Sequence, residues 1–265
     1  MSNVGKNPIK IEKNIESKKP IKAKKENSFL KFNNNQTKKV FVIISLIAII
    51  LLISIFIPKL FIPSIEKVKD SVVLIEVYDE NNEIIATGSG FSAYEKDWIV
   101  TNFHVIEGAS SISVITDEKE EYEVKDIVIF NKKEDLAIVK IDGSLNNLEL
   151  GNGNKVKTKD KVTAIGSPMG EQNTVSEGIV SNSDEKDIIR TTAPISHGSS
   201  GGVLLNNKNE VIGITSAGYD EAQNLNFAIN VNVLKSIYSD YKNNKYDVIN
   251  NSNYKDCSSN IINYN

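Results

Sequence analysis

Between residues 71 and 229 the chain alternates short apolar runs with polar turns. Turn residues such as Asn81-Asn82 and Asn206-Asn207 separate the runs, which are rich in Val, Ile and Thr. The runs of strand length are Ser71–Val77, Ile84–Thr87, Trp98–Thr101, Ser111–Ile115, Glu121–Ile129, Ala137–Ile141, Val162–Ile165, Thr174–Ser181, Ile188–Thr191, Gly202–Leu205, Val211–Ser216 and Leu225–Ile229. Helical periodicity is almost absent here, so the pattern predicts an all-β domain. Twelve strands suit two six-stranded barrels.

One helix is predicted after the last strand. Apolar and aromatic side chains recur at helical spacing behind the candidate caps Asn230 and Asn232; they are Leu234, Ile237, Tyr238 and Tyr241. We expect this helix to pack against the second barrel. The domain is thus predicted to span residues 65–242, after a linker at 58–64. Residues 243–265 are predicted to form a polar, disordered tail.

A long apolar run precedes the predicted domain. From Val40 to Ile57, eighteen residues are apolar except Ser45 and Ser54, which is enough for one transmembrane helix. A cleaved signal peptide is the alternative. It fits less well, because the basic region before the run is long and no small-residue cleavage site follows it. We therefore expect residues 40–57 to be a retained signal anchor in the cell membrane.

Charge is distributed unevenly along the chain. Residues 1–39 hold eleven Lys and three Glu, so they carry +8 in a chain whose net charge is −3. The positive-inside rule then places the N-terminus in the cytoplasm and the domain outside it, as a single-pass protein. The arm has the composition of a disordered cytoplasmic tail near an anionic membrane surface. No nucleic acid is expected as a partner, although a DNA-binding arm stays open as an alternative.

Three residue types in a particular order suggest covalent catalysis. A serine hydroxyl needs an adjacent base, and that base needs a group that orients it. His104 follows the strand ending at Thr101, and Asp135 precedes the apolar strand that starts at Leu136. Ser200 lies farther along the chain. The order His, Asp, Ser is that of one known arrangement of serine peptidases, and these three residues are the predicted catalytic triad.

Glycines surround the candidate nucleophile in the segment Gly198-Ser199-Ser200-Gly201-Gly202. They permit backbone conformations in which the N–H groups of Gly198 and Ser200 converge on one oxygen, as an oxyanion hole requires. Ser199 is the competing hydroxyl. Glu134 is the competing acid, and we expect it to face solvent if Asp135 faces the cleft, because neighbours on a strand alternate sides.

The chain resembles the HtrA/DegP branch of the trypsin-like serine peptidases from about Ile65 to Tyr238. The segments that carry the resemblance include Gly88-Ser89-Gly90-Phe91, Thr101-Asn102-Phe103-His104-Val105, Asp135-Leu136-Ala137, Ala164-Ile165-Gly166-Ser167-Pro168, Gly198-Ser199-Ser200-Gly201-Gly202 and Asn226-Phe227-Ala228-Ile229. The resemblance implies a chymotrypsin-like double β-barrel with the cleft between the barrels, and His104, Asp135 and Ser200 as the triad. It also implies that the strand from Ile214 to Gly218 pairs with an extended substrate.

Substrate contacts are predicted from the same segments. The residues are Ile195, Thr215, Ser216, Ala217, Asn226, Phe227 and Ala228. A modest apolar pocket bounded by Ile195 and residues 226–228 is predicted to favour small aliphatic side chains before the scissile bond. Many relatives carry a PDZ module after the protease, whereas here only a short polar segment follows the last helix. Position 199 is Ser where Asn is usual in the family.

The sequence thus predicts a membrane-anchored serine endopeptidase acting on misfolded or exported proteins. Polypeptides are its expected substrates. Two histidines and one cysteine offer too few ligands for a usual zinc site, so no metal or other cofactor is expected. A homo-oligomer is possible. The alternative is a catalytically silent barrel that serves as an extracytoplasmic peptide-binding or scaffold module.

Overall fold

The computed structural model describes residues 34–60, 62–216 and 226–243. The chain divides into two compact units, Met1–Ile57 and Pro58–Asn265. The helix α1 spans Asn34–Leu60. Among the described residues, no helix combines the length and the apolar character needed to cross a membrane. The tail predicted at 243–265 lies outside the described residues except for Asn243, which caps the last helix.

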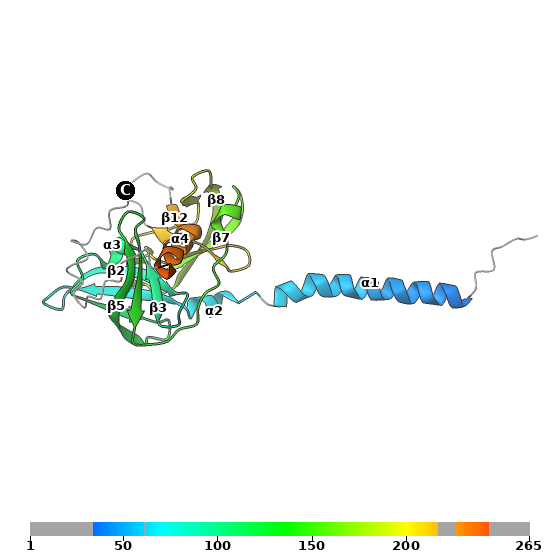
Figure 1. Ribbon diagram of the computed structural model, residues 1–265, viewed down its shortest axis with the longest axis horizontal. Helices are drawn as coiled ribbons and strands as arrows, with labels where there is room; N and C mark the ends of the chain where they lie inside the picture. The colour runs from blue at the N-terminus through cyan, green and yellow to red at the C-terminus, as the bar shows by residue number, and fades with distance from the viewer. Residues whose placement is uncertain (1–33, 61, 217–225, 244–265) are drawn as a thin grey trace, which may run out of the picture. The chain divides into compact units, whose positions relative to one another are not determined.

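Two closed antiparallel barrels of six strands each make up the second unit (Figure 1). The first has the strand order β1-β2-β3-β6-β5-β4 and contains β1 (Val72–Tyr78), β2 (Ile84–Ser92), β3 (Trp98–Thr101), β4 (Ser111–Ile115), β5 (Glu121–Asn131) and β6 (Leu136–Ile141). The second has the order β10-β11-β12-β9-β8-β7 and contains β7 (Lys161–Gly166), β8 (Thr174–Asn182), β9 (Ile188–Thr191), β10 (Val203–Leu205), β11 (Val211–Ser216) and β12 (Asn226–Asn230). The predicted double barrel is confirmed.

Short helices connect or flank the barrels. They are α2 (Ile65–Lys69), α3 (Phe103–Ile106), the 3₁₀ turns at Gly153–Lys155 and Pro168–Gly170, and the C-terminal helix α4 (Val231–Lys242). The side chain of Asn230 caps α4 by accepting a hydrogen bond from the N–H of Asn232. The predicted C-terminal helix is confirmed.

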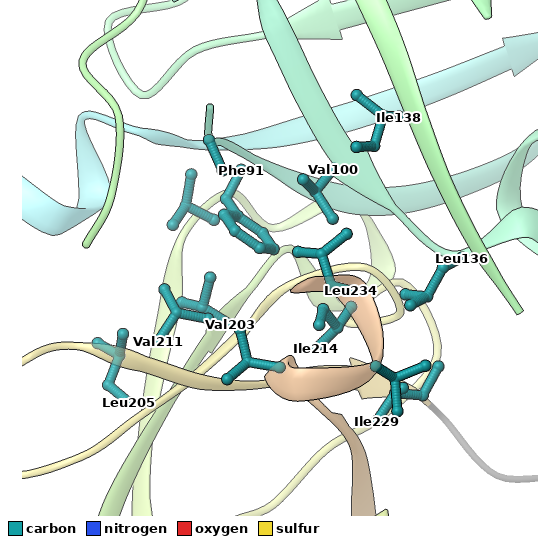
Figure 2. Packing of buried hydrophobic residues seen from close by; sticks show 14 of the residues in the cluster. Phe91, Val100, Leu136, Ile138, Val203, Leu205, Val211, Ile214, Ile229 and Leu234 are labelled. Carbon is teal, nitrogen blue, oxygen red and sulfur yellow. The ribbon is translucent and has the colours of Figure 1, made fainter. Parts of the chain in front are cut away.

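One apolar cluster, in addition to the core of each barrel, contains residues of both barrels (Figure 2). Its labelled members from the first barrel are Phe91, Val100, Leu136 and Ile138, and those from the second are Val203, Leu205, Val211, Ile214 and Ile229. Leu234 of α4 is fully buried among them. Each such side chain contributes roughly 1.5–3 kcal/mol by its burial, so the cluster holds the barrels in a fixed relation.

The helix α4 also contacts the first barrel. Tyr238 stacks on Tyr94 with ring centroids 3.7 Å apart, and Tyr241 meets Trp98 edge to face at 5.9 Å. Tyr94 and Trp98 belong to the β2–β3 region. The helix therefore packs against both barrels. The expected contact with the second barrel is present, and the aromatic residues of the helix add a contact with the first.

Candidate active site

His104 is held by a four-residue helix between β3 and β4. Its neighbours Phe103, Val105 and Ile106 are buried in the core of the first barrel, and Phe103 stacks on Phe130 at 5.3 Å. Burial of three of the four residues fixes α3 against the barrel. The His104 side chain is left 34% exposed, so the ring is anchored and still accessible.

Asp135 binds His104 at two points. Its Oδ2 lies 2.7 Å from His104 Nδ1, and its Oδ1 accepts a hydrogen bond of 2.9 Å from the His104 backbone N–H. Because a carboxylate only accepts hydrogen bonds, Nδ1 carries the proton and Nε2 has a free lone pair in the neutral ring. The two bonds together fix the ring's tautomer and orientation, which is what a general base requires.

The turn that carries Asp135 also positions its backbone. Asn102, two residues before His104, donates from Nδ2 to the Asp135 carbonyl oxygen at 2.8 Å. Asp135 has a φ of +51°, so it lies in the turn before β6 and not in the strand. Strand alternation therefore does not separate it from Glu134. Glu134 has a side chain 28% exposed and an ion pair of 3.1 Å with Lys133, so it faces solvent only in part.

Backbone hydrogen bonds define the turn that carries Ser200. Gly201 N–H donates to the Thr215 carbonyl at 2.8 Å, and Thr215 N–H donates to the Gly202 carbonyl at 2.9 Å. Thr215 Oγ1 adds a bond of 2.6 Å to the Ser199 carbonyl. Gly201 has a φ of +87°, and a Cβ there would overlap Ser89 O and Thr101 Oγ1, so only glycine fits.

The Ser200 turn is bonded to the part of the first barrel that leads into His104. Ser89 of β2 donates its N–H to the Ser200 carbonyl at 2.7 Å. Thr101 Oγ1, three residues before His104, donates to the Ser89 carbonyl at 2.7 Å. Two consecutive hydrogen bonds thus connect the nucleophile segment to the end of β3. Ser200 itself is 5% exposed.

The peptide before Gly198 has a defined orientation. The His197 carbonyl accepts a hydrogen bond of 3.0 Å from Met169 N–H, and the chain has no cis peptide among its described residues. In a trans peptide the carbonyl and the N–H point in opposite directions. The Gly198 N–H therefore points away from Met169. An oxyanion hole requires this N–H to be directed at the substrate carbonyl oxygen.

A pocket of about 420 Å³ lies beside His104 and Asp135. Its wall on the first barrel includes Phe103, His104 and Asp135, together with the charged residues Glu107, Lys132, Lys133 and Glu134. Ser216, Phe227 and Ile229 form its wall on the second. Residues of both barrels and of the predicted substrate-binding set therefore meet next to the imidazole.

The other predicted substrate residues do not share this pocket. Ile195 and Thr215 line a separate cavity of about 100 Å³, and Ala228 is fully buried in the core of the second barrel. Asn226 is partly exposed at the start of β12, and Ala217 lies outside the described residues. Ile195 and Phe227 therefore line two different pockets among those that the described residues form.

Thr215 was also wrongly predicted to be available to substrate. Its N–H, carbonyl and hydroxyl all bond to the Ser199–Gly202 turn, so its backbone is already occupied. Its side chain is 1% exposed. Thr215 supports the turn that carries Ser200 instead of pairing with a peptide.

Several residues of the site were not predicted from the sequence. Ser89, Thr101 and Met169 hold the backbone around Ser200 and Gly198 through the bonds described above. Gly88-Ser89-Gly90 was noted only as a segment typical of the family. The position of the small residue Ser89 between two glycines is the signal that could have indicated a close approach of another chain segment.

Comparison with known proteins agrees with this geometry. Residues 88–214 match the family described as "Trypsin-like peptidase domain". This part of the chain is similar to trypsin-like peptidase domains. The chain is also homologous to HtrA-type serine proteases, so the predicted resemblance is confirmed.

Three relatives illustrate the similarity. The chain is 36% identical over 175 residues to "Probable periplasmic serine endoprotease DegP-like" of Pseudomonas savastanoi pv. phaseolicola, covering 62% of this chain and 36% of the relative. It is 37% identical over 197 residues to the rat "Serine protease HTR4", covering 67% and 39%. It is 33% identical over 178 residues to "Anti-sigma-I factor RsgI9" of Acetivibrio thermocellus, covering 65% and 25%. The chain therefore spans well under half the length of these relatives.

Proposed function

We propose that the protein is a serine endopeptidase that hydrolyses peptide bonds of polypeptide substrates. The observation that carries the proposal is the His104–Asp135 pair, in which one carboxylate binds both the ring Nδ1 at 2.7 Å and the backbone N–H at 2.9 Å. This pair lies on a pocket that both barrels line. The resemblance to HtrA-type proteases supports the same conclusion.

The chemistry follows from the role of each group. His104 Nε2 removes the proton of the Ser200 hydroxyl as its oxygen attacks the scissile carbonyl carbon, and Asp135 stabilises the resulting imidazolium. The N–H groups of Gly198 and Ser200 donate to the oxyanion of the tetrahedral intermediate. His104 then gives the proton to the leaving amine, and an acyl-enzyme remains. Water, deprotonated by the same imidazole, hydrolyses the ester and restores Ser200.

We further propose that the domain is anchored in the cell membrane and acts outside the cytoplasm on misfolded or exported proteins. The support is the apolar run at residues 40–57 with the basic arm before it. One of the relatives is named a periplasmic endoprotease, which agrees with this location. Extraction of membranes at alkaline pH tests the anchor. The full chain should stay in the pellet, and a full chain carrying Ile47→Lys and Ile50→Lys should appear in the soluble fraction; a wild-type chain that is itself extracted would contradict the anchor.

Cleavage of an unfolded protein tests the enzymatic proposal. Wild-type protein should cut unfolded casein, and Ser200→Ala should reduce the rate by about 10⁶-fold, to the background level. Ser199→Ala is the matched control, because it removes the neighbouring hydroxyl and leaves the triad intact. Its rate should stay within about tenfold of wild type, because the substitution should remove less than about 1.4 kcal/mol of transition-state stabilisation. Absence of cleavage by folded wild-type protein would favour the silent scaffold.

A further inference from the structure

Ser89 lies in the middle of β2 and is fully buried. Its hydroxyl oxygen donates to the Gly198 carbonyl at 2.7 Å and accepts from the Ser167 N–H at 2.8 Å. Its backbone N–H donates to the Ser200 carbonyl, and its carbonyl accepts from Thr101 Oγ1. All of its polar groups are thus used, and they join the first barrel to two separate segments of the second.

The bonds of Ser89 bear directly on the two predicted oxyanion donors. The Gly198 N–H belongs to the peptide whose carbonyl bonds to Met169, and Ser89 Oγ holds the carbonyl of the next peptide. Both peptides that flank the Gly198 Cα are therefore fixed. This matters because a glycine at φ +90° has several other backbone conformations open to it, and a rotated peptide would turn the donor away.

The bond to Ser167 extends the same constraint. Ser167 precedes the 3₁₀ turn at Pro168–Gly170, and that turn supplies the Met169 N–H that holds His197. A single hydroxyl therefore bonds to both segments that define the peptide orientation at Gly198. Each of these segments is far from Ser89 in sequence, at 78 and 109 residues.

We propose that Ser89 is a positioning residue that sets the oxyanion-binding geometry of the second barrel from the first. The inference rests on the proposed function and assigns to β2 a role in the chemical step. Removing the hydroxyl leaves the Gly198 carbonyl and the Ser167 N–H buried without a hydrogen-bond partner. Rotation of the two peptide groups that contain them then becomes more favourable, because it can give them new partners. Ser89 does not line the pocket beside His104. The loss is therefore expected in kcat and not in KM.

Steady-state kinetics on the full chain test this inference, with a fluorogenic peptide whose sequence is taken from the wild-type digest of casein. Ser89→Ala should lower kcat by about 10- to 100-fold, less than the loss of a whole oxyanion donor, with KM within about twofold of wild type. Ser89→Cys keeps a weak donor in a somewhat larger side chain, and its kcat should lie between those of wild type and Ser89→Ala.

Ser92→Ala is the matched control. Ser92 is also a fully buried serine of β2, but its hydroxyl bonds to Asn147 Oδ1 at 2.8 Å, away from the Ser200 turn. Its loss should lower the thermal unfolding temperature, by less than the loss of Ser89 because one hydroxyl bond is lost and not two, and leave kcat within about twofold of wild type. This comparison separates positioning from general stability.

The outcomes are distinguishable. Equal kcat values for folded Ser89→Ala and Ser92→Ala, or a Ser89→Ala defect that lies in KM alone, would overturn the inference while leaving the proposed function in place. If Ser89→Ala does not fold, a wild-type kcat in Ser89→Cys together with a wild-type affinity for a peptide aldehyde, which mimics the tetrahedral intermediate, would overturn it equally. A folded wild type without any cleavage would instead contradict the proposed function, and the inference with it.

Discussion

The two barrels share a strand order and a common apolar cluster, yet they hold their functional groups in different ways. In the first barrel the groups are side chains that bind each other directly, as His104 and Asp135 do at 2.7 Å. In the second barrel they are mainly backbone groups of the Gly198–Gly202 turn. That turn is fixed by neighbours from β2, β11 and the loop after β7, which supply Ser89, Thr215 and Met169.

This difference has a physical basis. A hydrogen-bonded side-chain pair needs only two residues that face each other, and its interaction energy depends mainly on those two residues. A pair of converging N–H groups needs a strained backbone, which glycine allows but does not enforce, so several outside contacts must hold it. Substitutions in the His104–Asp135 pair should therefore act on chemistry with little change in stability, whereas those around the second barrel's turn should affect both.

The largest effect is expected from Asp135→Asn in the first barrel. The amide no longer stabilises the imidazolium, and it favours the wrong tautomer, so kcat should fall by about 10⁴-fold, the size known for this change in other serine proteases. The unfolding temperature should change little, because Asp135 is 32% exposed. Peptide kinetics and thermal unfolding measure the two quantities. Glu134→Gln is the control and should keep wild-type kcat; a comparable loss there would mean that the acid has been assigned to the wrong residue.

The next largest effect is expected from Gly201→Ala in the second barrel. A Cβ would overlap Ser89 O and Thr101 Oγ1, so the turn must move, and kcat should fall by roughly 10²–10³-fold together with the unfolding temperature. Gly108→Ala is matched in backbone strain, since Gly108 has a φ of +81° but no atom within 4 Å of its Cβ position. It should cost only about 1–2 kcal/mol of stability and leave kcat near wild type. Equal activity losses in both variants would show that strain, and not the crowded turn, causes the effect.

The smallest effect is expected where the first barrel meets α4. The Tyr94 hydroxyl is buried with no hydrogen-bond partner among the described residues, and burial raises the pKa of Tyr94 above its ordinary value. Tyr94→Phe should therefore stabilise the fold by about 1 kcal/mol at neutral pH and leave kcat unchanged.

The pH dependence of that variant follows from the direction of the shift. Because the pKa of Tyr94 is higher in the folded state, the unfolded state loses its proton first, and wild-type stability falls as the pH rises above about 10. The advantage of Tyr94→Phe should widen over this range. Chemical denaturation at pH 7 and at pH 10.5 measures it; an advantage that narrows at the higher pH would contradict the assignment.

Much of the fold could be predicted because each barrel strand corresponds to a short apolar run of consecutive residues, which the sequence shows directly. All twelve predicted runs overlap strands of the described residues, and the largest error occurs at small residues. The run at Ile84–Thr87 is in fact β2, Ile84–Ser92, because Gly88 and Gly90 continue the strand. Their missing side chains make room for Val105 and Ile99, which sequence alone does not reveal.

The site was predictable to the same extent. His104, Asp135 and Ser200 could be singled out because side-chain chemistry narrows the candidates to a few residues. The contacts of Ser89 and Thr215 could not, because they join backbone groups of segments that only the tertiary fold brings together. Thr215 illustrates the error: its sequence suggests a strand open to substrate, whereas its bonds to Ser199, Gly201 and Gly202 occupy it.

Mass-spectrometric mapping of a fluorophosphonate adduct tests the central claim most directly, since the reagent bonds only to an activated serine. If the pair from the first barrel activates the nucleophile of the second, wild-type protein should carry one adduct, on Ser200, and His104→Ala should carry none. An adduct on Ser199, or a Ser200 adduct that persists in His104→Ala, would contradict the account.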